Sequence, residues 1–214
     1  MTPDDTALLR ERAALLGVPL TDDALARIDC FLGILAIWNR RLRLTGERDR
    51  RTIVVRHVVD SLAPARWLPR EGLVIDIGSG AGFPGIVLAC LRPDLSFALI
   101  EARRRRASFL ADAIRSVPLP GARVVAERVE QVVGDPDLAH GARVVITRAV
   151  GLHAFLDAAA GLVAPDGAVI AMQTPGAREM AREVAERRGF VLADAYDYDL
   201  PDARKRSLLR FTLR

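Results

Sequence analysis

A turn with three alternating glycines contains the residue types best suited to chemistry in this 214-residue chain. It follows the apolar segment Leu73–Ile77, has Asp76 just before it, and holds its glycines at alternate positions, Gly78, Gly80 and Gly82. Glycine has no side chain and tolerates positive φ, so such a turn can bring backbone N–H groups close to a ligand. The pattern predicts a buried strand, a ligand-binding turn and the start of a helix.

Two ligands fit this turn. Residues 80–85 match the G-x-G-x-x-G pattern that binds a dinucleotide. Residues 76–82 match D-x-G-x-G-x-G, the pattern of class I methyltransferases that use S-adenosylmethionine. Asp76 favours the second ligand, because a carboxylate at the end of the strand would repel a pyrophosphate but suits a ligand carrying an ammonium and a sulfonium. A tight turn without a ligand is the remaining interpretation, and three glycines after an acid disfavour it.

The elements that must position this turn alternate between strand and helix from Leu73 onward, which predicts a doubly wound parallel sheet. The expected strands are Leu73–Ile77, Ser96–Ile100, Arg123–Ala126, Arg143–Thr147, Ala168–Met172, Phe190–Tyr198 and Ser207–Leu213. The last two are joined by too few residues for a helix, so they must pair antiparallel. The expected fold is therefore α/β, a seven-stranded sheet with an antiparallel last strand, which resembles the Rossmann-like class I S-adenosylmethionine-dependent methyltransferase fold.

The first 66 residues predict helices. Thr2 and Thr21 each stand shortly before a pair of aspartates and are expected to be the N-caps of two helices. A third helix is expected over about Arg51–Leu62. We therefore expect an N-terminal helical cap at residues 1–66 and a class I methyltransferase domain at residues 67–214, packed as one globular unit.

The residues just after each strand are the binding-site candidates, because ligands of open α/β sheets lie beyond the carboxyl ends of the strands. Glu101 follows the second strand and could accept hydrogen bonds from ribose hydroxyls, or serve only the next helix start. Arg128–Glu130 follows the third strand and could pass over an adenine, or form a surface loop. Arg148 follows the fourth strand and could meet an anionic group in the cleft, or lie on the surface.

Methyl transfer from a sulfonium is a direct displacement, in which positioning carries most of the catalysis. An acceptor such as guanine N7 has no proton to lose, so no general base is needed. No catalytic residue is assigned for this reason. His57 is not expected to be a base, and Ser61 lies near it on successive helical turns without the strained elbow of a nucleophile.

The net charge is +4, and nearly all of the positive charge is arginine, since Lys205 is the only lysine. The arginines gather in three clusters. The first is Arg40, Arg41, Arg43, Arg48, Arg50, Arg51 and Arg56, the second is Arg103–Arg106, and the third is Arg204 and Arg206 with Lys205 between them. Three clusters favour an anionic partner such as nucleic acid. A solvated basic surface is the alternative for so mild a charge.

No apolar run is long enough to cross a bilayer, and Met1–Arg12 lacks an apolar signal segment, so we expect a cytoplasmic protein with no membrane partner. Cys30 and Cys90 are expected to be reduced core thiols. The histidines are scattered, so no metal site is expected.

Several motifs together resemble one family, the bacterial 16S ribosomal RNA guanine-N7 methyltransferases, or glucose-inhibited division protein B family. The matching segments are Trp38–Arg40, Leu44–Thr45, Arg56–Leu62, Asp76–Gly85, Arg106–Leu110, Arg128–Glu130 and Thr147–Ala149. The resemblance implies a cytoplasmic enzyme that binds S-adenosylmethionine and acts on 16S ribosomal RNA or a small-subunit particle, and we expect a monomer. It implies cofactor contacts from Gly78, Phe83, Val129, Glu130 and Arg148, to which the residue pattern adds Asp76, Gly80 and Glu101. Arg148 and Asp60 are possible substrate-side contributors.

Three segments depart from the family pattern as we expect it. Arg43–Thr45 stands where Asn-Leu-Thr is usual, Thr147–Val150 where Ser-Arg-Ala-Phe is usual, and Ala171–Thr174 where Ala-Leu-Lys-Gly is usual, so the neutral Gln173 replaces a lysine. These departures fall on the presumed substrate side. They leave open a methyltransferase acting on another RNA or a small molecule, and a catalytically silent RNA-binding relative.

Overall fold

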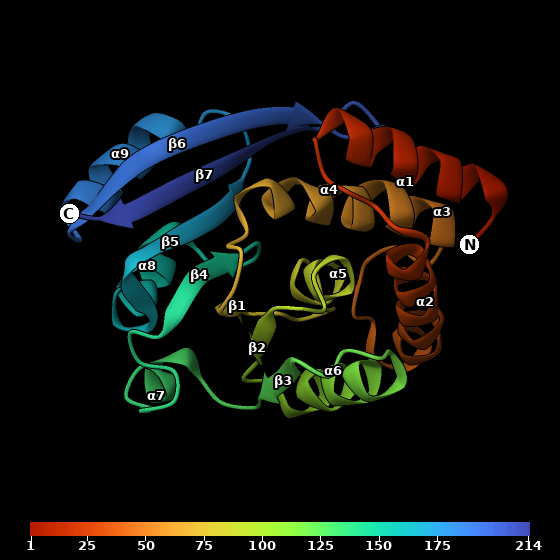
Figure 1. The fold of residues 1–214 in the computed structure, drawn as a ribbon, viewed down its shortest axis with the longest axis horizontal. Coiled ribbons are helices and arrows are strands. Elements are labelled where there is room, and N and C mark those ends of the chain that lie inside the picture. The colour runs from red at the N-terminus through yellow and green to blue at the C-terminus, as the bar shows by residue number, and fades with distance from the viewer.

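A seven-stranded sheet forms the centre of the computed structural model, which describes residues 1–214 (Figure 1). Its strands are β1 (Leu73–Ile77), β2 (Ser96–Ile100), β3 (Ala122–Val125), β4 (Ala142–Thr147), β5 (Val163–Gln173), β6 (Phe190–Asp199) and β7 (Lys205–Leu213). They lie in the order β3-β2-β1-β4-β5-β7-β6. The first five strands pair in parallel, and β7 pairs antiparallel with both β5 and β6. The predicted fold, with its antiparallel last pair, is confirmed.

The N-terminal third is helical, as expected. Its elements are α1 (Pro3–Leu15), α2 (Asp22–Leu42), α3 (Arg50–Ile53), the π-helical turn η1 (Val54–Val58), α4 (Val59–Leu62) and the 3₁₀ turn η2 (Ala63–Trp67). The expected third helix is therefore one helical run interrupted by a π turn. Thr2 and Thr21 accept hydrogen bonds from Asp5 N and Ala24 N, both at 3.1 Å, which confirms the two predicted N-caps.

The remaining helices follow the strands. They are α5 (Gly85–Leu91), α6 (Arg104–Ser116), α7 (Val129–Val132), α8 (Leu152–Leu162) and α9 (Arg178–Glu186). Most bounds agree with the sequence pattern to within two residues. The exception is β5, which begins at Val163 rather than Ala168, because Val163 already pairs with Ala142 before the register of the two strands shifts.

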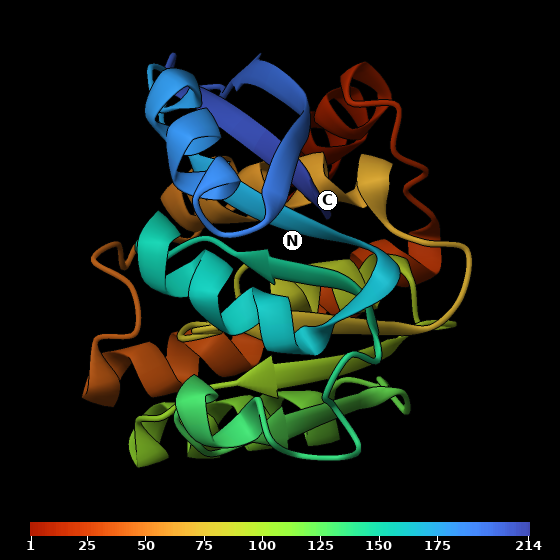
Figure 2. The ribbon, with the colours of Figure 1, turned by 90° about the vertical axis from the view of Figure 1, so that its left-hand side faces the viewer.

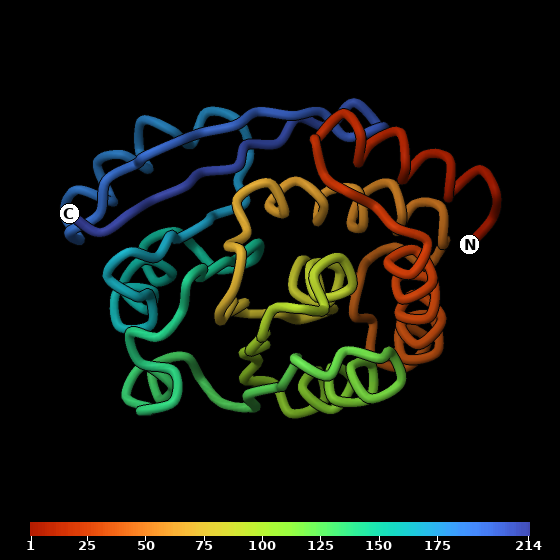
Figure 3. The backbone as a smooth tube through the Cα atoms, in the orientation of Figure 1, coloured from red at the N-terminus to blue at the C-terminus, as the bar shows by residue number.

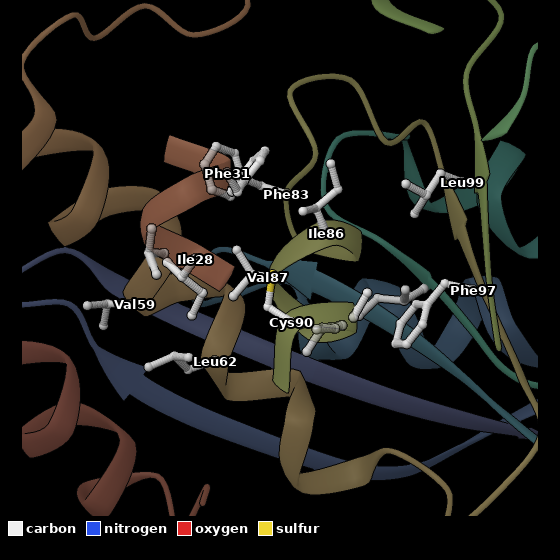
Figure 4. Close-up of a cluster of buried hydrophobic side chains, with 14 of the residues drawn as sticks. Ile28, Phe31, Val59, Leu62, Phe83, Ile86, Val87, Cys90, Phe97 and Leu99 are labelled. Atoms are coloured by element: carbon white, nitrogen blue, oxygen red, sulfur yellow. The ribbon is translucent and has the colours of Figure 1, made fainter. Parts of the chain in front are cut away.

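Two hydrophobic clusters cover the two faces of the sheet. In β1, Val74 belongs to one cluster while Ile75 and Ile77 belong to the other, because alternate residues of a strand face opposite sides. The first cluster joins residues of α1, α2, α4 and α5 to the sheet, and Figure 4 shows part of it. The second cluster contains residues of α7, α8 and α9. Figure 2 shows these helices on the opposite side from α5.

The N-terminal helices pack directly on the sheet domain. Figure 3 traces the first part of the chain around α5, and Phe31 of α2 contacts Phe83 edge to face with ring centroids 5.4 Å apart. The first cluster runs from Leu9 to Leu208 and so crosses the predicted boundary at residue 66. The division into residues 1–66 and 67–214 stays a prediction.

The two cysteines differ in exposure. Cys90 is buried and Cys30 is exposed, so the prediction of two core thiols is wrong for Cys30, whose Sγ lies 3.6 Å from the Ser116 carbonyl oxygen at the end of α6. No helix has both the length and the apolar character that crossing a bilayer requires.

Candidate functional site

The strand register brings the predicted site residues to one edge of the sheet. Ile77 of β1 lies beside Ile100 of β2, and the N–H of Gly78 donates to the Ile100 carbonyl at 2.9 Å. On the other side of β1, the hydroxyl of Thr147 donates to the Ile77 carbonyl at 2.8 Å. The glycine turn, Glu101 and Arg148 therefore follow three adjacent strands at the same carboxyl edge.

The glycine turn needs glycine at each alternate position. Gly78, Gly80 and Gly82 have φ values of +76°, +52° and +85°, a region that residues with a side chain rarely adopt. A Cβ on Gly78 would lie 2.9 Å from a methyl group of Val150, and one on Gly82 would lie 2.8 Å from Ile86. At Gly78 and Gly82 the space over the turn admits backbone only, as expected for a turn that receives a ligand closely.

Asp76 lies beneath the turn and is only 1% exposed. One carboxylate oxygen accepts a hydrogen bond from Gly85 N at 3.1 Å, while Oδ1 is buried without a partner. Burial raises the pKa of this carboxyl to about 6. Asp76 therefore ties the start of α5 to β1 and places a carboxyl group, ionised only above about pH 6, under the turn.

Glu101 is buried at the end of β2 and bonds to both neighbouring segments. One oxygen accepts from Gly80 N at 3.1 Å and the other accepts from Arg103 N at 2.8 Å. The carboxylate thus holds the glycine turn and the start of α6 together. Its contact with a ribose stays a prediction.

Val129 and Glu130 stand at the start of α7. Val129 is half-buried and packs against the second hydrophobic cluster, whereas Glu130 is exposed. No hydrogen bond or ion pair of the structure joins either side chain to the glycine turn. Their contact with an adenine stays a prediction.

Arg148 enters the interior beside the turn, so it is not a surface arginine. Its guanidinium carbon lies 5.2 Å from the centre of the buried Phe83 ring, and the His57 ring stacks on Phe83 at 5.1 Å. Arg148 Nη1 lies 3.6 Å from Oδ2 of Asp60. Burial lowers the pKa of Arg148, although Asp60 opposes that shift.

Asp60 is the centre of a polar cluster that sequence analysis found only in part. This aspartate is 3% exposed, and its Oδ1 accepts a hydrogen bond from the Tyr198 hydroxyl at 2.7 Å. Arg206 Nε lies 3.6 Å from the same oxygen. Burial and the adjacent Asp60 raise the pKa of Tyr198, which stays a neutral donor. Tyr198 gave no sequence signal, because it lies 138 residues from its partner.

Glu47 is a second residue that the sequence did not indicate. Its two oxygens contact His57 Nε2 at 2.9 Å and Arg56 Nη1 at 3.1 Å. The hydrogen bond with His57 is the main reason that the pKa of Glu47 falls to about 2. Burial lowers the pKa of His57. Ser61 donates to the His57 backbone carbonyl at 2.6 Å, which excludes it as a nucleophile activated by this histidine.

A cavity of about 470 Å³ opens beside Arg148. It is lined by Arg56, His57, Asp60, Arg148, Ala149, Val150, Gly151, Met172, Gln173, Thr174, Arg204 and Arg206. Four arginines and one carboxylate face this space, whose volume lies in the range of small-molecule sites. Of the three N-terminal helical segments, only the third contributes to the wall; the rest comes from the ends of β4 and β5 and from the start of β7.

The sheet with its antiparallel last pair and the glycine turn at its carboxyl edge are those of the class I S-adenosylmethionine-dependent methyltransferase fold. Solved structures share this fold. TYW2 of M. jannaschii, solved with AdoMet, is similar with a TM-score of 0.59 and 19% identity over 74% of this chain and 76% of that one. The 16S rRNA methyltransferase KamB is similar with a TM-score of 0.54 and 14% identity over 66% and 87% of the two chains.

Sequence comparison gives the family. The model for rRNA small subunit methyltransferase G matches residues 24–204. Ribosomal RNA small subunit methyltransferase G of Halorhodospira halophila is 38% identical over 195 residues, covering 90% of this chain and 88% of that protein. The protein of the same name from Dichelobacter nodosus is 39% identical over 150 residues, covering 70% and 69%. The chain belongs to the rRNA small subunit methyltransferase G family, which confirms the resemblance seen in the sequence.

Proposed function

We propose that this protein transfers a methyl group from S-adenosylmethionine to N7 of a guanine in 16S ribosomal RNA. One observation carries the proposal: the arginine-lined cavity opens beside Arg148 and Phe83, next to the glycine turn. A nucleotide in that cavity would therefore lie alongside a cofactor on the turn. Family membership supports ribosomal RNA as the source of the nucleotide.

The cofactor would lie over the carboxyl edge of β1, β2 and β4. The methionine end would lie against the turn at Gly78 and Gly80. It would fit there only because Gly78 has no side chain, since a Cβ at Gly78 would already meet Val150. Glu101 would accept from the ribose, and Val129 with Glu130 would border the adenine. The Asp76 carboxylate would favour the positive charges of the ligand through the turn.

When bound, S-adenosylmethionine supplies an electrophilic methyl group on a sulfonium. The residues of the chain position the acceptor and balance charge. Guanine N7 has no proton, so neither His57 nor any carboxylate is required as a base. The base becomes cationic as it is methylated, and Asp60 is the carboxylate in the cavity wall that would offset this charge.

The cavity is suited to one nucleotide taken out of its stack. Enzymes that act on a base in RNA bind it in a pocket of this kind and read its edges with polar groups. Arg56, Arg204 and Arg206 would bind the phosphate or the O6 atom, because arginine donates in pairs to oxygen acceptors. Arg148 and Phe83 would separate the nucleotide from the cofactor while leaving a path for the methyl group.

The test is calorimetric binding of S-adenosylmethionine, followed by transfer of a radiolabelled methyl group to small-subunit RNA and mapping of the modified base. Gly78→Asp should abolish cofactor binding, because φ is +76° and Val150 lies 2.9 Å from the added Cβ. Gly134→Asp is the matched control, since nothing lies within 4 Å of a Cβ there and its φ is ordinary. Retained cofactor binding by Gly78→Asp would contradict the placement of the ligand.

Two alternatives have distinct outcomes. Gln173 is neutral and lies in the cavity wall, so cofactor binding without transfer to 16S RNA would point to another RNA or a small molecule. A folded chain that binds RNA but not the cofactor would be a silent relative. We also propose a cytoplasmic monomer that acts on RNA or on an assembled subunit, which sedimentation and assays on both substrates would resolve.

A further inference from the structure

The three arginine clusters of the sequence differ in how their charges are used. Arg50, Arg51 and Arg56 bond to acids of the N-terminal third, and Arg204 and Arg206 contact Asp202 and Asp60. The remaining eight arginines of these three clusters form no ion pair: Arg40, Arg41, Arg43, Arg48, Arg103, Arg104, Arg105 and Arg106. These eight, which we call the arginine surface, combine part of the first cluster with all of the second.

The arginine surface lies where the end of α2 meets the start of α6, two helices that pack together (Figure 1). It holds two cavities. One, of about 550 Å³, has Arg43, Arg48 and Arg106 in its wall. The other, of about 370 Å³, has Arg41 and Arg103–Arg106 in its wall. Arg106 is common to both, and neither wall contains an acidic residue.

The start of α6 makes this accumulation of charge electrostatically unfavourable. The N-terminus of a helix carries partial positive charge and favours acids, and α1 and α2 each have two aspartates in the first turn. In α6 the N-cap is Arg103, without a side-chain cap, and Arg104–Arg106 follow in the first turn. The Glu101 carboxylate accepts from Arg103 N at 2.8 Å, but no ion pair joins any of these four arginines to an acid. An anionic ligand accounts for arginines that oppose the helix dipole in this way.

The arginine surface adjoins both the glycine turn and the loop that supports the cavity beside Arg148. A guanidinium nitrogen of Arg106 lies 3.6 Å from the Cβ position of Gly80, in the glycine turn. The loop that carries Arg43 and Arg48 also carries Glu47, which bonds to His57 in the wall of the acceptor cavity. An RNA strand that places one nucleotide in that cavity can therefore continue across this loop.

We propose that the arginine surface binds the phosphodiester backbone of the substrate RNA next to the target nucleotide, at a cost to the stability of α6. This inference rests on the proposed function. It predicts opposite changes in thermal stability and in RNA affinity. Replacing Arg104 and Arg105 by acids should stabilise the start of α6 and weaken RNA binding. A purely structural role for these residues would move both measurements the same way.

The experiment compares the wild type with Arg104→Gln/Arg105→Gln and Arg104→Glu/Arg105→Glu. Both side chains are exposed. The probe is a 16S RNA transcript, bound at several salt concentrations. The slope of log affinity against log salt should lose about 2 in magnitude in the neutral variant, one for each lost phosphate contact. The acidic variant should gain about 2–4 °C in Tm, with unchanged affinity for S-adenosylmethionine. Arg70→Gln/Arg182→Gln removes two exposed arginines elsewhere and should leave the salt slope unaltered.

The outcomes separate this inference from the proposed function. If the wild type neither binds nor methylates the RNA, the proposed function fails, and the inference fails with it. If the wild type methylates RNA while both variants retain its affinity and salt slope, only the inference is wrong. Weaker binding to assembled subunits with unchanged binding to naked RNA would overturn it in favour of an acidic protein partner.

Discussion

Replacing Asp76 by asparagine should stabilise the protein at neutral pH and remove a pH dependence. Asp76 is buried, its Oδ1 has no hydrogen-bond partner, and burial raises its pKa from 3.8 to about 6. Asparagine is neutral and nearly the same shape, and its amide oxygen can still accept from Gly85 N. The variant therefore keeps the hydrogen bond that holds the start of α5 and loses the buried charge.

The magnitude follows from proton linkage. The folded protein binds this proton more tightly than the unfolded chain, so the stabilisation is complete below pH 3.8 and is lost as the pH rises through about 6. The difference between the folded and unfolded pKa values corresponds to about 3 kcal/mol of folding stability, present when Asp76 is protonated and absent when it is ionised. Between pH 5 and pH 8 the wild type should lose about 1.4 kcal/mol from Asp76 alone.

Urea denaturation of both proteins at pH 5 and pH 8 measures this effect. The stability difference between Asp76→Asn and the wild type should grow by about 1.4 kcal/mol from the lower to the higher pH. Other titrating groups, such as Glu47, are common to both proteins and cancel in this double difference. A variant that is less stable than the wild type at pH 8, or a difference that does not change with pH, would refute the reasoning.

The same variant tests whether the charge of Asp76 serves the cofactor. An ammonium and a sulfonium favour the ionised carboxylate, so the wild-type affinity for S-adenosylmethionine should fall as the pH drops below about 6. Asp76→Asn should bind more weakly at pH 8 and show no such dependence. A wild-type affinity that is constant from pH 5 to pH 8 would show that Asp76 supports only the turn.

Three further substitutions have defined expectations. Tyr198→Phe removes the 2.7 Å hydrogen bond to the buried Asp60 and should cost about 1–3 kcal/mol of stability in urea denaturation. Gly85→Ala would bring a Cβ to 2.5 Å from two side-chain atoms and should cost about 1–3 kcal/mol, whereas Gly134→Ala has open space and should be nearly neutral. Arg43, at φ +46°, ends α2 in the left-handed region, so Arg43→Asn should raise stability by about 0.5 kcal/mol.

Each of these three substitutions has a control variant that tests the reason given for its effect on stability. Tyr196→Phe removes a hydroxyl that makes no hydrogen bond, so an equal loss in both tyrosine variants would show that Asp60 is not the reason. Equal costs for the two glycine variants would contradict the close contact at Gly85. Arg43→Lys keeps the charge and the strained backbone, and a gain in stability there would argue against strain at this position.

The fold could be predicted because its signals are local. The glycine turn, the threonine caps and the alternation of strands with helices depend on neighbouring residues, and a connection as short as 200–204 forces β6 and β7 to be antiparallel. The π turn at Val54–Val58 has no local signal of this kind in the sequence. The early start of β5 likewise depends on its neighbour, Ala142 of β4.

The candidate site was predicted where a residue follows a strand and missed where long-range packing supplies it. Glu101 and Arg148 follow β2 and β4, so their place at the sheet edge could be read from the sequence. Glu47 lies in a loop and joins the site through its contacts with His57 and Arg56. The arginine surface could be recognised only after the structure had shown which arginines of the three clusters pair with acids.

The antiparallel last pair explains why Asp60 and its partners meet. Because β7 runs against β5, with Gln173 beside Ser207, its first residues lie at the same carboxyl edge as the glycine turn. Tyr198 and Arg206 are then opposite each other across β6 and β7, and both reach Asp60. A parallel last strand would begin at the other edge of the sheet and place Arg206 far from the cavity. The strand direction that distinguishes this fold from ordinary dinucleotide-binding domains therefore also brings two of the polar residues to the acceptor site.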